Sequence, residues 1–233
     1  VESLLRDADI AMYEAKRAGK NRISMFDDRL LDVAHRRLDL KVALPQALTE
    51  RQFSLAYQPI KDATLGHLRG FEALIRWEHP ELGAISPAEI IPNAEESGLI
   101  VDIGRWVLDE ACRQTAVWNA ASPQPLSVNV NVSAVQLRHP SFVGDVVRTL
   151  HAHDLDPALL VLEITESVLA ESAQCRDALQ QLRATGVGLA IDDFGTGYSS
   201  LAYLHRMPAT CVKIDRAFIA ELDQGTDSSL THS

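Results

Sequence analysis

The stretch GLAIDDFGTGYSSL, residues 188–201, indicates both a fold class and a site. A short apolar run ends in two adjacent acids, Asp192 and Asp193, and glycines with small polar residues follow directly. A near-continuous apolar run is typical of a strand that is covered on both faces in a parallel sheet. Turn-forming residues after the acids mark the end of that strand. The stretch therefore predicts a buried parallel strand that carries two carboxylates at its carboxyl end.

The chain repeats this pattern from residue 53 onward. Strand-like runs occur at 53–60, 70–77, 126–132, 159–165, 187–194 and 211–215. Helical patterns lie between most of them, at 101–118, 142–150 and 174–185, the last closed by Gly186. Strand–helix units of roughly 30 residues indicate right-handed βαβ crossovers in a parallel sheet. An open doubly wound sheet and a (β/α)8 barrel both fit this rhythm.

The positions of the polar residues favour the barrel. Each lies within or at the end of a different predicted strand: Glu72, Asn131, Glu163, Asp192 and Lys213. In a barrel the carboxyl ends of the strands converge on one face, whereas an open sheet would string these residues out in a line. We therefore predict an α/β fold of the TIM-like (β/α)8 barrel type.

The N-terminal part of the chain reads differently. Residues 4–18 have apolar residues at helical spacing, which predicts a helix, and NRISMF at 21–26 can form a short strand. A second, charge-rich helical pattern covers 28–44 and fits a helix that connects two domains.

Composition limits the class of function. Lys and Arg total 22 and Asp and Glu total 32, so the formal net charge is −10, which argues against a duplex DNA or RNA partner. A phosphate substrate remains compatible if metal ions reverse the local charge. The cysteines Cys112, Cys175 and Cys211 form no zinc or disulfide spacing, and no stretch approaches about 18 consecutive apolar residues. We expect a cytoplasmic protein whose segment here makes no membrane contact.

Several carboxylates in one barrel mouth repel one another unless they are protonated or bind cations. Oxygen ligands without a cysteine or histidine cluster favour Mg²⁺ or Mn²⁺ over zinc. Asp192 and Asp193 together could serve two ions about 3.5–4 Å apart, an arrangement suited to phosphate-ester hydrolysis. Lys213 would stabilise the transition state or hold the attacking water. The alternative is that each acid is a structural hydrogen-bond acceptor beside a common turn sequence.

The longer phrases of the sequence resemble one family. FEALIRWEHP at 71–80, LEITES at 162–167, IDDFGTGYSSL at 191–201 and VKID at 212–215 together resemble the EAL family of cyclic di-GMP phosphodiesterases. The resemblance runs from about residue 45 to 220 and includes YQPI at 57–60 and VNVSAVQL at 130–137. LLRDADIAMYEAKRAGKNR at 4–22 is similar to the last helix of a GGDEF, or diguanylate cyclase, domain. We therefore expect a GGDEF remnant at 1–27, a linker helix at 28–44 and the EAL domain at 45–233.

The resemblance implies roles for individual residues. The implied reaction is hydrolysis of cyclic di-GMP to linear pGpG in bacterial second-messenger signalling, with two Mg²⁺ or Mn²⁺ ions. Lys213 would orient the attacking water, and Glu166 would hold the loop after Asp193 in place. That loop would also couple the site to the partner in a homodimer. Gln58 and Arg76 would contact the dinucleotide. The implied metal ligands are Glu72, Asn131, Glu163, Asp192 and, for the second ion, Asp193.

The sequence departs from the family at its C-terminal end. The family's barrel has two more strands after VKID, one of which carries a further glutamate in an EGVE-like phrase. Here LDQGTDSSLTHS at 222–233 is polar, and Glu221, Asp223 and Asp227 are poor substitutes. We therefore expect a truncated barrel, and the sequence leaves open whether this truncated chain is itself active. The alternatives are a non-catalytic module that binds cyclic di-GMP or a protein, although its usual degenerate motifs are not seen, and a non-functional fragment.

Overall fold

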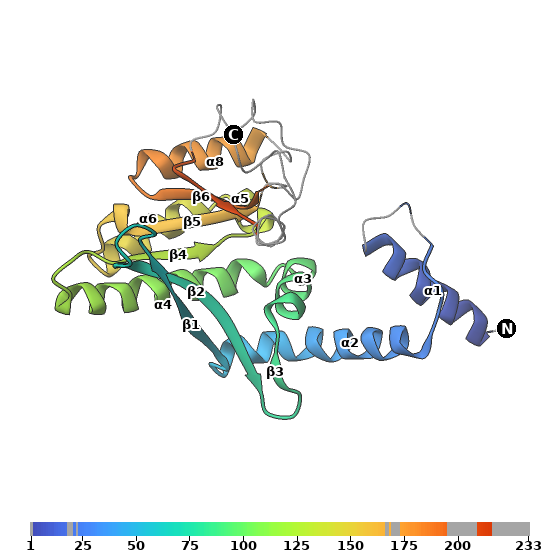
Figure 1. Ribbon diagram of the computed structural model, residues 1–233. Coiled ribbons are helices and arrows are strands. Elements are labelled where there is room, and N and C mark those ends of the chain that lie inside the picture. The colour runs from blue at the N-terminus through green and yellow to red at the C-terminus, as the bar shows by residue number, and fades with distance from the viewer. Residues whose placement is uncertain are drawn as a thin grey trace. The chain divides into compact units, whose positions relative to one another are not determined.

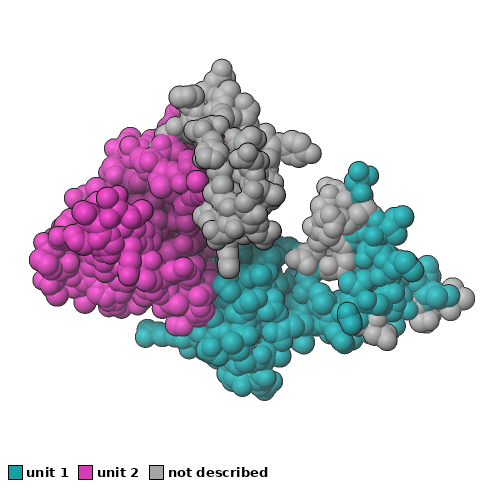
Figure 2. Space-filling view, viewed as in Figure 1, with its two compact units in different colours: residues 1–53, 77–99 teal, residues 54–76, 100–233 magenta. Residues whose placement is uncertain are grey.

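The computed structural model describes residues 2–17, 21, 23–165, 168, 173–194 and 209–215. The chain divides into two compact units, one made of residues 1–53 and 77–99 and the other of 54–76 and 100–233 (Figure 2). The predicted acids all belong to the second unit, so its sheet is the framework of the candidate site.

One sheet runs through the described strands (Figure 1). Its order is β1 (Phe53–Lys61), β2 (Leu68–His79), β4 (Ser127–Asn131), β5 (Leu160–Thr165), β6 (Gly188–Phe194) and β7 (Cys211–Ile214), and β3 (Gly83–Ile85) pairs with β2. Each strand from β2 to β7 along this path is parallel to the next, while β3 is antiparallel to β2. The six predicted strand runs are confirmed within two residues at each end.

The connection from β1 to β2 breaks the strict alternation of strands and helices. A turn at 62–67 joins the two strands directly. Asp62 shapes it by accepting hydrogen bonds from the backbone N–H groups of Thr64 and Leu65, and Gly66 adopts a φ of 67°. Left-handed backbone of this kind favours glycine.

Among the helices described in the second unit are α4 (Ile100–Ala121), α5 (Ala134–Arg138), α6 (Phe142–Ala152), the 3-10 helix η1 (Pro157–Leu159) and α8 (Ala173–Ala184). The predicted helices at 101–118, 142–150 and 174–185 are therefore confirmed. The helix α5 was not predicted, because it is too short for a periodic signal; its sequence signature is the reciprocal capping box between Ser133 and Gln136.

The core of this unit explains why the polar residues share a face. Alternate strand residues point to opposite sides of a sheet. One set is buried in a core with side chains of α4, α6 and α8; among the strand residues in it are Val128, Val130, Leu160, Leu162, Ile164, Leu189 and Ile191. The residues between them place Asn129, Asn131, Glu163 and Asp192 on the other face. Burial of the apolar set therefore fixes the orientation of the polar set.

The first unit contains α1 (Glu2–Arg17), α2 (Asp28–Thr49) and α3 (Pro87–Ser97). The helix α2 continues through Pro45, beyond the predicted end at 44. Its buried residues Leu40 and Leu44 belong to the apolar core of the unit together with Trp77 and Ile90. The Trp77 indole donates to Gln52 Oε1 at 2.9 Å, so its one polar atom is satisfied.

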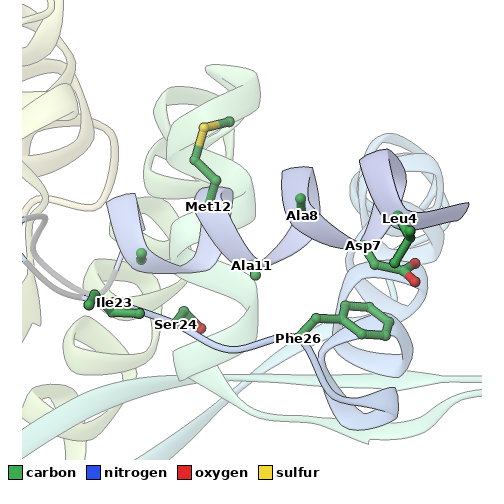
Figure 3. A pocket seen from close by; sticks show the side chains of 9 residues that line it. Leu4, Asp7, Ala8, Ala11, Met12, Ile23, Ser24 and Phe26 are labelled. Carbon is green, nitrogen blue, oxygen red and sulfur yellow. The ribbon is translucent and has the colours of Figure 1, made fainter. Parts of the chain in front are cut away.

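The prediction of a short strand at 21–26 is wrong for the residues described there, which form no strand. The residues Ile23 and Met25 are 94% and 84% exposed, and part of the segment borders an apolar pocket with α1 (Figure 3). Strand formation requires a neighbouring strand for the backbone N–H and C=O groups, and no described strand pairs with this segment. Across the described chain, no helix has the length and apolar character needed to cross a membrane.

Candidate functional site

Three carboxylates meet on the polar face of the sheet. Glu72 comes from β2, Glu163 from β5 and Asp192 from β6, and one oxygen of each lies within 4.8 Å of the others. The side chain of Glu163 is completely buried, whereas those of Glu72 and Asp192 retain 17% and 21% exposure. The sheet thus brings together acids that are up to 120 positions apart in the sequence (192 − 72 = 120).

Lys213 on β7 binds all three acids. Its Nζ donates to Glu163 Oε2 at 2.6 Å, to Glu72 Oε2 at 2.9 Å and to Asp192 Oδ2 at 3.4 Å. Burial alone would lower the pKa of Lys213, but hydrogen bonds to Glu163 and Glu72 raise it above its ordinary value. Burial raises the pKa of Glu163, against the hydrogen bonds from Lys213 and Asn129. The lysine therefore stays charged and partly neutralises the acids.

The contact between Lys213 and Glu72 shows that the sheet is strongly curved. Three strands separate β7 from β2 in the sheet order. Four flat steps of about 4.8 Å would place the two strands about 19 Å apart. The ammonium and the carboxylate nevertheless meet at 2.9 Å. The sheet must therefore curl around its polar face.

Two asparagines of β4 hold the glutamates. Asn131 Nδ2 donates to Glu72 Oε1 at 2.9 Å, and Asn129 Nδ2 donates to Glu163 Oε1 at 2.7 Å. Asn131 was among the predicted residues, but Asn129 was missed. The alternation of valine and asparagine in VNVNV was the available signal, because it places both asparagines on the face opposite the buried valines.

Asp193 lies beside the acidic cluster, but it does not belong to the set of three carboxylates. Its φ of 53° is left-handed, and its backbone N–H donates to Asp192 Oδ1 at 3.0 Å. Burial, followed by the charges of Asp192 and Asp215, raises the pKa of the Asp193 carboxyl. A carboxyl in such surroundings gains from a nearby cation.

The remaining predicted residues lie elsewhere. Gln58 is exposed on β1, and Arg76 is half-buried on β2 with its Nη1 donating to the backbone oxygen of Ile75 at 2.8 Å. Neither has a hydrogen bond to the three acids within the described part of the chain. Glu166, the loop 195–208 and the C-terminal acids Glu221, Asp223 and Asp227 lie outside the described residues.

The donor set fits a hard divalent cation. The polar face offers carboxylate oxygens from three strands, and amide groups already hold two of the carboxylates in place. Mg²⁺ and Mn²⁺ prefer such oxygen ligands. A cluster with more carboxylates than ammonium groups also favours a bound cation electrostatically.

The family described as the EAL domain matches residues 41–233. Among curated relatives, the bifunctional diguanylate cyclase/cyclic di-GMP phosphodiesterase MucR of Pseudomonas aeruginosa is 48% identical over 227 residues, which cover 97% of this chain and 33% of the relative. The cyclic di-GMP phosphodiesterase NbdA of the same organism is 40% identical over 222 residues, covering 95% and 28%. The chain thus spans about a third of the length of these relatives.

Solved structures agree with this match. A cyclic di-GMP complex of the MucR phosphodiesterase has a TM-score of 0.75 at 50% identity, covering 79% of this chain and 75% of that one. The cyclic di-GMP-bound EAL domain of FimX from Pseudomonas aeruginosa has a TM-score of 0.72 at 28% identity, covering 80% and 75%. The mixed α/β fold described above is therefore the fold of these domains.

Proposed function

Because the chain belongs to the EAL-domain family of cyclic di-GMP phosphodiesterases, we propose that it hydrolyses one phosphodiester bond of cyclic di-GMP and releases linear pGpG. The observation that carries this proposal is the junction of Glu72, Glu163 and Asp192 around Lys213. Relatives that share the family are named as phosphodiesterases of this dinucleotide, and related domains have been solved with it bound.

The proposed cofactor is a pair of Mg²⁺ or Mn²⁺ ions. Glu72, Asn131, Glu163 and Asp192 would hold the first, and Asp193 would contribute to the second. When bound, such ions supply water activation and neutralise charge on the phosphoryl oxygens. The support is the oxygen donor set and its excess of negative charge.

The chain's own residues would do the rest. The Lys213 ammonium is held at the centre of the three acids, where it can keep the attacking water in place and balance the charge that develops on the phosphate. Glu166 would hold the loop that follows Asp193. Gln58 and Arg76 would contact the dinucleotide, in keeping with their positions on the first two strands of the sheet.

Further proposals concern the architecture. The strong curvature between β2 and β7 supports a TIM-like (β/α)8 barrel of which the described strands are a part. The resemblance of the sequence to GGDEF and EAL domains supports a division into a GGDEF remnant at 1–27, a linker helix at 28–44 and the EAL domain at 45–233. The same resemblance is the basis for proposing a homodimer through the loop after Asp193. A cytoplasmic location is proposed on the three cysteines, which form no disulfide among the described residues.

Turnover of cyclic di-GMP by the purified protein with Mn²⁺, followed by chromatography for pGpG, tests the proposed function. We expect turnover that EDTA abolishes and that Asp192→Asn lowers at least about 100-fold. Asp177→Asn is the matched control, because it removes the same charge from an exposed position on α8. Wild-type turnover by Asp192→Asn would disprove the metal assignment, while binding without turnover by the wild type would favour the non-catalytic alternative.

A further inference from the structure

The buried carboxylate of Glu163 has a separate donor on each oxygen. Oε1 accepts from Asn129 at 2.7 Å and Oε2 accepts from Lys213 at 2.6 Å. An ionised carboxylate only accepts hydrogen bonds, so the Asn129 amide must present its nitrogen. Both distances are short, as expected for hydrogen bonds to a charged group. Together they fix the plane of a carboxylate whose side chain has no solvent exposure.

The two asparagines of β4 act in parallel on two glutamates. Glu72 and Glu163 each receive an asparagine amide on Oε1 and the Lys213 ammonium on Oε2. Each glutamate therefore has one oxygen held by β4 while the other faces the centre of the cluster. Asn129 therefore does for Glu163 what Asn131 does for Glu72, although only Asn131 was predicted as a metal ligand.

Strand register alone does not produce these bonds. Across the sheet, Glu72 is the register partner of Asn129, and Glu163 is the register partner of Asn131. The hydrogen bonds cross, because each asparagine donates to the glutamate that pairs with the other one. The side chain of Asn129 thus reaches diagonally to Glu163, which is a specific contact between the two groups.

We propose that Asn129 is a positioning residue that fixes the Glu163 carboxylate for binding of a divalent cation, an inference that rests on the proposed function. Asn129 is half-buried and Glu163 is fully enclosed, so solvent cannot freely replace the lost donor. Without it, Oε1 loses its hydrogen bond and the carboxylate can rotate away from the orientation in which Oε2 faces the cluster.

The test is a titration of the purified protein with Mn²⁺, in which the electron paramagnetic resonance signal measures the free Mn²⁺. This measurement does not depend on turnover. Asn129→Ala should weaken Mn²⁺ binding about tenfold, the low end of the usual loss when a group that orients a metal ligand is removed. In a Glu163→Gln background, measured at higher Mn²⁺ concentrations, the same substitution should change the affinity by less than about twofold, because the group through which it acts has been altered.

Val161→Ala is the matched control, since Val161 is the register partner of Asn129 on β5 and makes no hydrogen bond to the acids through its side chain. It should leave the Mn²⁺ affinity within about twofold of the wild type. If Asn129→Ala does not fold, Asn129→Ser serves instead, with an intermediate loss expected because a shorter hydroxyl donor remains.

The outcomes separate the inference from its premise. Tight Mn²⁺ binding by the wild type together with unchanged affinity in Asn129→Ala would overturn the positioning role alone. An equal loss with and without Glu163→Gln would overturn it too, because Asn129 would then act by another route. Absence of Mn²⁺ binding by the wild type would overturn both the positioning role and the proposed metal site.

Discussion

At the scale of single residues, Lys213 is the group on which the acidic cluster depends. Its ammonium is the shared donor to carboxylates from three strands, and one of these is completely buried. A buried carboxylate that loses its cation is costly unless it takes up a proton. Substitution of Lys213 should therefore change how stability depends on pH as well as reducing activity.

We predict that Lys213→Met, without added metal, loses stability as the pH rises above the unfolded glutamate pKa of about 4.3. Burial already raises the pKa of Glu163, and loss of the ammonium raises it further. A raised pKa means that the folded state holds the proton more tightly than the unfolded state, so stability falls as the pH rises through the interval between the two pKa values. Urea denaturation at several pH values measures this. Lys61→Met, an exposed lysine on β1, is the control, and equal pH slopes for both variants would contradict the prediction.

A second prediction at this scale concerns the thiols. Cys112 and Cys175 are buried and Cys211 is exposed, and burial raises the pKa of Cys112 to about 12. Since the thiolate is the reactive form, one thiol should react with Ellman's reagent at pH 8 in the native protein, and all three after denaturation. Cys211→Ser should remove the native reaction. Rapid native reaction of a second thiol would show that the core opens easily.

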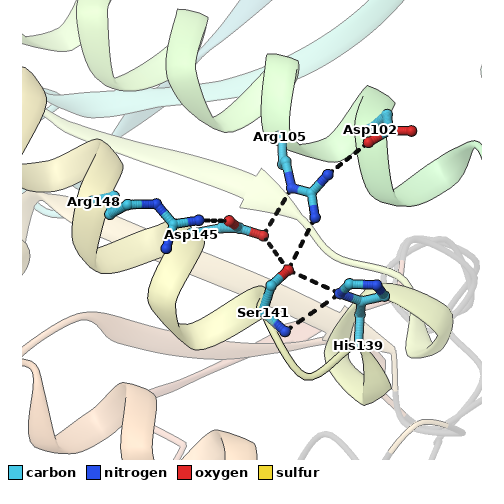
Figure 4. Close-up of polar contacts among 6 residues, drawn as sticks. All are labelled: Asp102, Arg105, His139, Ser141, Asp145 and Arg148. Atoms are coloured by element: carbon cyan, nitrogen blue, oxygen red, sulfur yellow. Dashed lines mark hydrogen bonds and ion pairs between the residues drawn. The ribbon is translucent and has the colours of Figure 1, made fainter.

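At the scale of elements, a polar cluster joins α4 to α6 (Figure 4). Arg105 of α4 donates to Asp145 Oδ2 at 2.9 Å and to Ser141 at 3.0 Å, and Arg148 also binds Asp145. Asp145 lies in the first turn of α6, where a negative charge also favours the helix. Its side chain is only 6% exposed, so this acid is well shielded from solvent.

We predict that Asp145→Asn lowers the free energy of unfolding by about 2 kcal/mol at pH 7. Burial by itself would raise the pKa of Asp145, but hydrogen bonds from Ser141 and Arg105 outweigh it and lower the pKa. A lowered pKa contributes stability above the unfolded value of about 4, and this contribution is lost as the pH falls through the folded value. Urea denaturation at pH 7 and pH 3 should show the difference between wild type and variant shrinking in acid. A constant difference would mean that the charge of Asp145 is unimportant.

Elements differ in how far sequence predicts them. The strands of the sheet were predictable, because apolar runs bounded by turn residues carry their signal locally. The helix α5 and the strand β3 were not predictable from the sequence. Each is too short, at five and three residues, to give a periodic pattern of apolar residues. The strand prediction at 21–26 was wrong because, among the described strands, none pairs with this segment despite its strand-like composition. Convergence of Glu72, Glu163, Asp192 and Lys213 followed from the strand positions, but the hydrogen bond of Asn129 depends on a diagonal contact between strands that no local pattern specifies.

At the scale of the whole molecule, the net charge of −10 opposes the approach of an anionic dinucleotide. Binding should therefore require the divalent cation, and we predict that cyclic di-GMP raises the melting temperature only when Mn²⁺ or Mg²⁺ is present. A ligand at about 100 times its Kd stabilises the folded state by about 2.7 kcal/mol. Differential scanning fluorimetry of the wild type with excess cyclic di-GMP, in the presence of Mn²⁺ and in the presence of EDTA, measures the shift. An equal shift in EDTA would show that recognition does not depend on the cation.

The hydrogen bonds from Lys213 to Glu72 and Glu163 make dinucleotide affinity depend on how firmly β7 is docked in the sheet. If β7 leaves the sheet for part of the time, the cluster loses its lysine, and the fraction of molecules with a complete site falls with it. The apparent Kd for a dinucleotide that requires the complete site is then the intrinsic Kd divided by that fraction. A substitution on β7 such as Val212→Gly, which removes the side chain next to Lys213 and leaves every proposed site residue in place, would thus weaken binding as the docked fraction falls, and a binding curve would report a folding equilibrium.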